Sequence, residues 1–343
     1  MRHGTFLKFM WPSLLAMMLF IALPIVSVFL QSVYAEHEQV LIETENCGPF
    51  GCTKATAVDQ EATRALREAE PLGRFVGADI YADRSHLAFS QVAAIWRGSD
   101  LGEFFGRIMN LPFYRALAFT LSYTAIVTPL VILFGMLIAL GVNSLPRLVR
   151  GPTIFFTLLP MIVTPLIGSL ILFWMIDARG IIGETLINIT GDPNLSLKSS
   201  TVLTWITLFV YGVWHHAPFA FIVFYAGLQT VPEETLEAAV VDGASRWERI
   251  RYVVVPHMMP LVVFVTLIQL MDNFRVLEPI VGFSAQAHAH SLSSIIYNDL
   301  FGRESPLYGS AAATSILTIL GVAILLTPVL VRTWRDFNRR NAK

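Results

Sequence analysis

Polar side chains stand inside two of the long apolar stretches of this chain. They are Gly212, His215, His216 and Phe219 in one stretch, and Gln269, Asp272, Asn273 and Val276 in the next. Each set has the spacing i, i+3, i+4 and i+7, which places its members on one face of a helix. Polar groups are costly in hydrocarbon and usually face a cavity or one another. Two such faces on consecutive helices predict one polar pocket near the middle of a membrane.

Hydrogen bonding to a hydroxyl-rich solute is the chemistry that this pocket would perform. Gln269 and Asn273 can exchange hydrogen bonds with hydroxyl groups, and an ionised Asp272 accepts them strongly. Either histidine could donate, and Phe219 could stack on the C–H face of a ring. The alternative is that Asp272 pairs with Arg275 and that the histidines bond across helices.

The composition places these residues in a bilayer. Of the 343 residues, 55% are hydrophobic and only 14% are charged, whereas about a quarter are charged in ordinary soluble domains. The apolar residues form long blocks, and about 20 such residues in a helix cross the hydrocarbon core. Backbone groups there must be satisfied within the helix. The formal net charge of −1 gives no indication of nucleic acid.

Six blocks are long enough to span, which predicts an all-α membrane protein with six transmembrane helices. They are residues 9–34, 117–142, 153–175, 201–228, 261–283 and 309–331. The first block could be a cleaved signal peptide, because Arg2, His3 and Lys8 precede it. Its apolar stretch is longer than the usual signal-peptide core, and no clean cleavage site ends it before Ala35. We therefore expect it to remain as a span.

Basic residues in the short loops predict the orientation, because Lys and Arg resist translocation. They are Arg2, Lys8, Arg147, Arg150, Arg246, Arg249, Arg251, Arg332, Arg335, Arg339, Arg340 and Lys343. With six spans, all of them fall on one side, so both termini are expected in the cytoplasm. The predicted divisions are a tail with the first helix (1–34), an external segment (35–116), a core of five spans (117–331) and a cytoplasmic tail (332–343).

The external segment holds both cysteines of the chain, Cys47 and Cys52. An oxidising compartment would allow a small disulfide loop between them. Two free thiols without a role are the alternative, and a metal site is disfavoured because no histidine or second cysteine pair stands nearby. Residues 60–70 have the composition of a short exposed helix.

Sequence motifs of catalysis are absent. The chain has no G-x-x-x-x-G-K-[ST] loop, no H-E-x-x-H and no C-x-x-C. His288 and His290 could form a metal pair, but two histidines in a loop are more often plain polar residues. We therefore expect neither an enzyme nor a bound metal or cofactor.

The basic loop between the fourth and fifth blocks has a composite pattern of small, acidic and proline residues. Pro232 fits a first helical position, and Glu233 and Glu234 favour the positive end of a helix dipole. Gly243 can end this helix, and Trp247 is an apolar anchor in a second short helix. A solvated helix on the membrane surface is the alternative interpretation.

This loop resembles the EAA loop of permeases in binding-protein-dependent ABC importers. The matching residues are Glu237-Ala238-Ala239, Gly243 and Val253-x-Val255-Pro256, while Ala226 to Glu234, Asp242-Gly243-Ala244 and Pro260 resemble the carbohydrate, maltose-permease branch. The similarity covers residues 113–331. It implies the ABC importer permease core in a bacterial inner membrane, as a multi-pass protein.

The resemblance also implies the partners. The loop would form a cytoplasmic coupling helix between spans four and five, docked on an ATPase through Glu237, Ala238, Ala239, Asp242, Gly243 and Trp247. Two ATP-binding subunits would hold ATP and Mg, and a second permease or a second copy of this chain would complete the pathway. A periplasmic solute-binding protein would deliver the solute.

The solute follows less directly from the resemblance. The two polar faces coincide in position with solute-contacting residues of maltose-type permeases, although most residue types differ. Where sugar permeases often have a Gly-Gly-Pro turn, this chain has Val281-Gly282-Phe283, which puts the external gate and the particular solute in doubt. A carbohydrate is expected. Another small solute, such as an amino acid or polyamine, or an ion-coupled secondary transporter using Asp272, remain alternatives.

Overall fold

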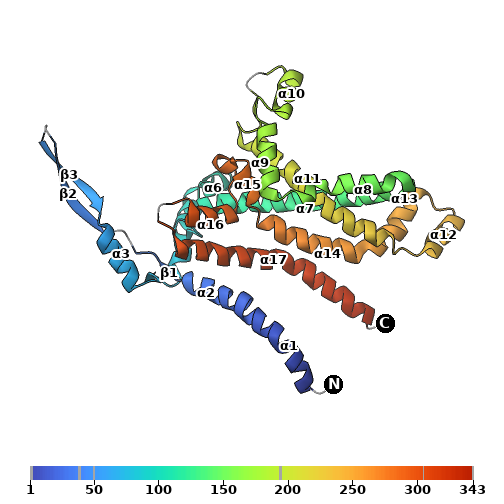
Figure 1. Cartoon of the computed structure of the whole chain (residues 1–343), viewed down its shortest axis with the longest axis horizontal. Helices are drawn as coiled ribbons and strands as arrows, with labels where there is room; N and C mark the ends of the chain where they lie inside the picture. Colours follow the sequence, from blue (N-terminus) through green and yellow to red (C-terminus); the bar gives the residue numbers. More distant parts are fainter. Residues whose placement is uncertain (1–2, 38–39, 49–50, 193–194, 304, 342–343) are drawn as a thin grey trace. The chain divides into compact units, whose positions relative to one another are not determined.

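A computed structural model describes residues 3–37, 40–48, 51–192, 195–303 and 305–341. The described chain is mostly helical (Figure 1). It divides into two compact units, one formed by residues 1–115 and 295–319 and the other by residues 116–294 and 320–343. Arg2 and Lys343, on which the predicted orientation partly depends, lie outside the described residues.

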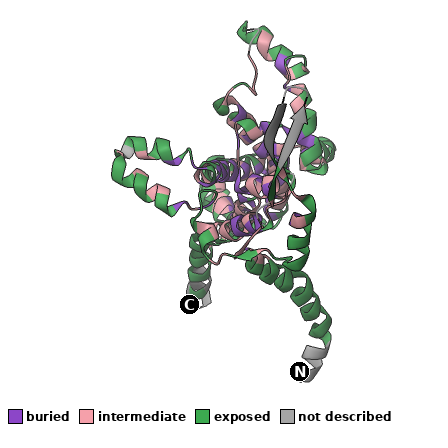
Figure 2. Cartoon of the chain, turned by 90° about the vertical axis from the view of Figure 1, so that its left-hand side faces the viewer, coloured by how far each residue is buried: buried purple, intermediate pink, exposed green. Residues whose placement is uncertain are grey.

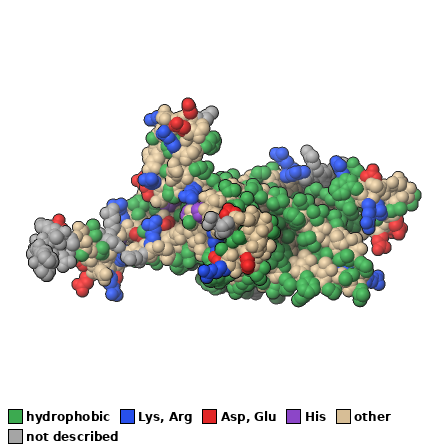
Figure 3. All heavy atoms as spheres, turned by 90° about the horizontal axis from the view of Figure 1, so that it is seen from above, with side chains coloured by type: hydrophobic (Ala, Val, Ile, Leu, Met, Phe, Trp, Pro, Cys, Tyr) green, Lys and Arg blue, Asp and Glu red, His purple; other side chains and the backbone are tan. Residues whose placement is uncertain are grey.

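Within the described residues, five helical stretches are long and apolar enough to cross a membrane. They are Phe9–Gln31, Pro112–Asn143, Thr201–Leu228, Arg246–Phe274 and Tyr308–Arg335. A sixth candidate is a bent pair of helices, Arg147–Ile162 and Pro165–Met175. Figure 3 shows the hydrophobic side chains that these helices expose over much of one face. Each predicted span therefore has a counterpart, although two of them differ in form.

The first unit carries the N-terminal helix and the predicted external segment. Its elements are α1 (His3–Met17), a π-helical turn (Met18–Ala22), α2 (Leu23–Gln31), β1 (Tyr34–Ala35), β2 (Leu41–Gly48), β3 (Gly51–Val58), α3 (Gln60–Ala69), β4 (Arg74–Phe75), α4 (Asp79–Ala82), α5 (Phe89–Gly98) and α6 (Leu101–Ile108). It also includes most of α16 (Leu292–Phe301) and the start of α17 (Tyr308–Asn341). None of the most apolar window of the N-terminal helix is buried, as expected of a helix that faces lipid.

Hydrogen bonds tie the segment predicted to be external to the start of α17. The backbone N–H of Gly309 donates to Glu36 Oε1 over 2.6 Å, and the His86 ring lies 3.1 Å from the Ser310 carbonyl oxygen. β1 pairs with β4 in an antiparallel ladder. The predicted exposed helix is α3, capped by Asp59, whose carboxylate accepts from the Ala62 N–H over 2.9 Å.

The second unit is a bundle of helices around an apolar core. Its elements are α7 (Pro112–Asn143), α8 (Arg147–Ile162), α9 (Pro165–Met175), α10 (Ile181–Thr190), α11 (Thr201–Leu228), α12 (Glu233–Val241), α13 (Arg246–Arg249), a π-helical turn (Ile250–Val254), α14 (Val255–Phe274), α15 (Glu278–Gly282) and a 3-10 turn (Ala285–Ala287). α11 packs against α8 and α14. Phe119, Phe221, Phe224 and Met258 are fully buried in this core, which appears at the centre of the burial view (Figure 2).

The predicted third span, 153–175, is not one continuous helix. α8 ends at Ile162, and α9 begins at Pro165 after a bend of 95°. Val163 and Thr164 have extended backbone angles. The ring of a proline disfavours the helical conformation for the residue before it, so Pro165 explains the break.

The predicted fifth span, 261–283, is also wrong in its bounds. α14 ends at Phe274, and a separate short helix, α15, begins at Glu278. Pro279 explains this end, because its ring would clash with the Arg275 carbonyl and removes one donor. At the other end the helix continues back through the π-helical turn to Arg246. The polar face predicted for mid-span therefore lies in the last turn of α14, with Val276 beyond it.

The two cysteines face each other across a β-hairpin. The register of β2 and β3 places Cys47 opposite Cys52, while Pro49 and Phe50 in the turn lie outside the described residues. This pairing of the backbone favours the predicted disulfide over two unrelated thiols.

We predict that neither cysteine reacts with maleimide when the protein, purified without reductant, is unfolded. Reduction should expose two thiols, the total for the chain. Cys47→Ser is the matched control, because it should leave one reactive thiol at Cys52 without reductant. Mass spectrometry would count the labels. Labelling of the unreduced natural protein would contradict the disulfide.

Candidate functional site

A polar cavity of about 400 Å³ lies within the second unit. It is lined by Tyr123, Pro165, Tyr211, His215, His216, Asp272, Asn273, Arg275, Val276, Glu278 and Pro279. These residues come from α7, α9, α11, α14, α15 and the turn after α14. Small-molecule sites usually have volumes of about 300–1,000 Å³ with a few converging polar groups, so this cavity has the size and chemistry of a solute site.

The two helix breaks border this cavity. Pro165 is the first residue of α9, and Pro279 is the second residue of α15. α9 and α15 pack directly together, and Gly282 allows the contact, because a Cβ there would lie 1.8 Å from Ser169 Oγ. The Tyr211 hydroxyl donates to the Pro165 carbonyl over 2.7 Å. This hydrogen bond fixes the start of α9 against α11.

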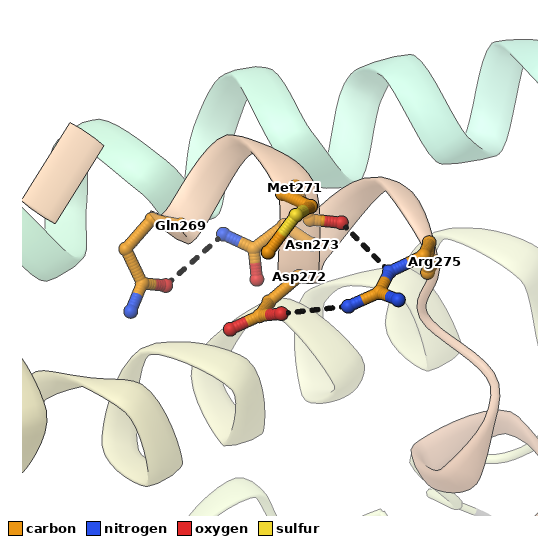
Figure 4. Close-up of polar contacts among 5 residues, drawn as sticks. All are labelled: Gln269, Met271, Asp272, Asn273 and Arg275. Carbon is orange, nitrogen blue, oxygen red and sulfur yellow. Dashed lines mark hydrogen bonds and ion pairs between the residues drawn. The ribbon is translucent and has the colours of Figure 1, made fainter. Parts of the chain in front are cut away.

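The last turn of α14 supplies the polar groups on one side of the cavity. The Asn273 amide donates to Thr128 Oγ1 on α7 over 3.0 Å and to Gln269 Oε1 over 3.4 Å. Arg275 pairs with Asp272 over 3.0 Å. Figure 4 shows two separate sets of contacts here, Asn273 with Gln269 and Arg275 with Asp272 and Met271. The pairing of Asp272 with Arg275 was the alternative to a solute contact, but both side chains line the cavity.

Aromatic rings form the opposing face on α11. The Tyr211 and His215 rings, one helical turn apart, stack with centroids 5.8 Å apart and an angle of 11°. The His216 ring stands edge-on to His215, with centroids 5.2 Å apart. Both histidines line the cavity.

Three buried polar atoms at this cavity have no hydrogen-bond partner among the described residues. They are Tyr123 Oη, His215 Nδ1 and Asn273 Oδ1. Tyr123 and Asn273 each expose only 1% of their surface. Buried polar groups nearly always have a protein or water partner. All three atoms are almost inaccessible to solvent in this structure, so the cavity walls would have to shift for water or a solute to reach them.

Five of the eight residues predicted to face a pocket line this cavity. They are His215, His216, Asp272, Asn273 and Val276. Gln269 is buried behind Asn273, and Phe219 packs against the apolar core. Gly212 lies where a Cβ would come within 2.2 Å of Tyr123 Oη, so its role is to let α7 and α11 approach.

Sequence reasoning missed the tyrosines and Glu278. Tyr211 precedes His215 by one helical turn, and this spacing could have included it in the α11 face. Glu278 was expected inside a continuous fifth span, so its position at the start of a separate helix, α15, could not be predicted. Tyr123 reaches the cavity from α7, and no local pattern marks it.

The loop between α11 and α14 forms an exposed pair of short helices, α12 and α13. The Gly243 N–H donates to the Val240 carbonyl over 3.0 Å and the Ala244 N–H to the Ala239 carbonyl over 2.9 Å. With Gly243 at a φ of +79°, this is a Schellman end to α12. Ser245 and Glu248 then form a capping box that starts α13. The predicted end of the helix at Gly243 is confirmed.

Residues of α12 and α13 that were predicted to meet an ATPase are free of contacts that would bury them. Glu237, Ala238, Asp242 and Gly243 are exposed, Ala239 is half-buried, and Trp247 exposes 67% of its surface. Pro232 caps α12 rather than occupying its first helical position. Figure 3 shows acidic and basic side chains gathered at this end of the second unit.

Comparison with known families decides the class of protein. The model of the family described as "Binding-protein-dependent transport system inner membrane component" matches residues 131–332. The chain belongs to this family. It is therefore a permease component of a bacterial inner membrane, as the loop pattern predicted.

Curated relatives of the permease are transport system permease proteins. The lactose transport system permease protein LacF of Rhizobium radiobacter is 27% identical over 64% of this chain and 76% of the relative. The sn-glycerol-3-phosphate transport system permease protein UgpA of Rhizobium meliloti is 30% identical over 61% of this chain and 72% of the relative. The trehalose transport system permease protein SugA of Mycobacterium tuberculosis is 26% identical over 65% of this chain and 71% of the relative.

A solved structure shares the fold of the permease. It belongs to a bacterial ABC transporter involved in the import of the acidic polysaccharide alginate, with a TM-score of 0.68 and 17% identity. The match covers 98% of this chain and 99% of that chain. At this identity the likeness concerns the fold.

No group of three or more His, Cys, Asp or Glu side chains within the described part of the permease could hold a metal ion. His288 instead contacts the start of α11: its ring lies 3.3 Å from Thr201 Oγ1, and its carbonyl accepts from Trp205 Nε1 over 3.0 Å. His288 therefore anchors the turn after α15 to α11.

We predict that Gly212→Ala destabilises the permease. The added Cβ would lie 2.2 Å from Tyr123 Oη and 2.9 Å from Tyr123 Cζ, and overpacking of this kind costs about 1–3 kcal/mol. The melting temperature of the detergent-solubilised protein should fall. Gly141→Ala is the control, because nothing lies within 4 Å of its Cβ position, and replacing a helical glycine should stabilise slightly. Equal melting of the two variants would contradict the close contact.

Proposed function

We propose that this permease carries a carbohydrate or polyol through the cavity between the two helix breaks. The observation that carries the proposal is a cavity of about 400 Å³ lined by polar and charged side chains beside stacked aromatic rings. Hydroxyl groups of a sugar can both donate to and accept from such side chains. An aromatic ring offers an apolar face to the C–H groups of a sugar ring.

The names of the curated relatives support this class of solute. They include permeases for lactose, trehalose and arabinooligosaccharides. A relative for sn-glycerol-3-phosphate has comparable similarity, so polyol derivatives belong to the range. No single sugar follows from these names, and the proposal is limited to the class.

The topology that we propose has six spans, with α8 and α9 counted as one broken span and both termini in the cytoplasm. Basic residues near α8, near α13 and at the end of α17 support this orientation. The α12–α13 loop is then cytoplasmic, and the segment from 35 to 116 is external. That segment would be accessible to a periplasmic binding protein.

The assembly that we propose contains two ATP-binding subunits, a second permease subunit or a second copy of this chain, and a periplasmic solute-binding protein. ATP and Mg would bind the ATP-binding subunits and not this chain. α12 would be the coupling helix, with Glu237, Ala238, Ala239, Asp242, Gly243 and Trp247 on the docking surface. The exposure of this surface and the family of the chain support the assignment.

One continuous helical stretch would connect this docking surface to the cavity. It runs over the 29 residues from Arg246 to Phe274, about 43 Å at the rise of an α-helix. Trp247 stands near its start, and Asp272 and Asn273 stand in its last turn. A movement imposed on α12 and α13 by the ATP-binding subunits would therefore displace one wall of the cavity.

We predict that Gly243→Leu abolishes uptake while the protein remains inserted. A left-handed conformation costs about 1–2 kcal/mol for a residue with a Cβ, so the end of α12 and its docking geometry should change. Affinity purification should show loss of the ATP-binding subunits. Gly191→Leu is the matched control, because Gly191 ends α10 with a similar φ of +70° and an equally open Cβ position. Retained ATPase binding and uptake in Gly243→Leu would contradict docking through this loop.

We also predict that uptake depends on ATP and not on an ion gradient. An ionophore that collapses the gradient at constant cellular ATP should leave uptake of the labelled solute unchanged. ATP depletion with the gradient maintained should stop it. The reverse pattern would favour a secondary transporter, for which Asp272 would be the coupling carboxylate.

A further inference from the structure

The charges of the side chains that line the cavity do not sum to zero. Among its lining residues, Asp272 and Glu278 carry carboxylates, and Arg275 carries the one guanidinium. The remaining polar lining residues are histidines, tyrosines and Asn273. One carboxylate is therefore left over.

Arg275 is already engaged by neighbours on its own helix. Its Nη2 pairs with Asp272 Oδ1 over 3.0 Å, and its Nε donates to the Met271 carbonyl over 3.3 Å (Figure 4). Oppositely charged groups in contact largely cancel each other's field at a distance. Arg275 and Asp272 together thus contribute little net charge to the cavity.

Glu278 is the carboxylate without a counter-ion. No ion pair with its side chain occurs among the described residues, and its backbone carbonyl lies 3.4 Å from Ser169 Oγ. As the first residue of α15, it is held at the cavity by the helix break. Tyr123, Tyr211 and His215 line the same cavity.

The polar groups of the cavity include both acceptors and donors. The Asn273 amide nitrogen already donates to Thr128 and Gln269, so its free Oδ1 accepts. Arg275 keeps N–H groups beyond the two that it donates to Met271 and Asp272. Hydrogen-bonding capacity alone therefore does not set the charge preference of the cavity, and the unpaired carboxylate of Glu278 does.

From this excess of negative charge, we propose that Glu278 is a specificity-determining residue that makes the cavity select against anionic sugars. Neutral sugars, or sugars bearing a protonated amine, fit this charge. A phosphate or carboxylate would place a like charge beside Glu278, which is the unfavourable contact that produces discrimination. This inference rests on the proposed function and adds the charge class of the solute.

A cysteine reporter in the assembled importer measures the field of the cavity without any solute. His216→Cys, with Cys47→Ser and Cys52→Ser, would react with cationic trimethylammonioethyl and anionic sulfonatoethyl methanethiosulfonates. For each thiol we compare the rate of reaction with the cationic reagent to the rate with the anionic one. We expect this ratio to be about tenfold higher for the cysteine than for mercaptoethanol in solution, which is the effect of one nearby charge at an intermediate dielectric. Glu278→Gln should remove most of this preference. Glu184→Gln, on exposed α10, should leave it unchanged.

Solute selectivity is tested on the same reporter by protection against an uncharged methanethiosulfonate. Glucosamine and glucose should protect at concentrations at least tenfold lower than glucose 6-phosphate, and Glu278→Gln should reduce that difference. Equal protection by all three sugars, unaltered in Glu278→Gln, would overturn the selectivity and leave the solute site intact. If none of the three sugars protected the cysteine, the proposed solute site would be contradicted, and the proposed selectivity with it.

Discussion

The need to satisfy backbone groups inside a membrane is the constraint on which the candidate site depends. An unbroken helix meets this need by itself, and α7 and α11 do so. Two other helices are interrupted by prolines, at Pro165 and Pro279, and each break frees carbonyl and N–H groups. The Tyr211 hydroxyl holds the start of α9 through the Pro165 carbonyl, and the two short helices α9 and α15 pack against each other. The cavity lies at this junction.

The breaks also explain why so many polar groups meet in one place. A straight fifth span would have carried Asp272 and Glu278 on different turns of one helix. Because α14 ends at Phe274 and α15 starts at Glu278, both carboxylates line the same cavity. Arg275 has room at the end of the helix to fold back onto Asp272. In our proposal, the charge selectivity of the cavity therefore depends on the end of α14 at Phe274, which lets Glu278 reach the cavity.

Much of the fold could be predicted from the sequence because hydrophobic length is a local property. Six apolar blocks predicted the spans, and the EAA-like loop predicted a helix that ends at Gly243. The prolines at 165 and 279 were visible, but a proline inside a span either kinks or breaks it depending on its neighbours. The packing of α9 on α15 decides between these outcomes, and that contact joins residues more than a hundred positions apart.

Less of the candidate site could be predicted, because contacts between residues far apart in the sequence decide which side chains meet there. The periodicity of α11 and α14 identified five lining residues, because spacing within one helix defines a face. It could not separate Gly212, which makes room for Tyr123, from a residue that faces a solute. Nor could it identify Tyr123 or Glu278, which reach the cavity from other helices.

The contact between Gly282 and Ser169 has a consequence for how this family of sequences can vary. With 1.8 Å between Ser169 Oγ and the place of a Cβ on residue 282, an alanine at 282 requires a glycine at 169 or a shifted α15. Substitutions at the two positions should therefore be coupled. A shifted α15 would carry Glu278 with it, so in our proposal the bulk of a single methyl group at 282 would alter the charge selectivity of the cavity.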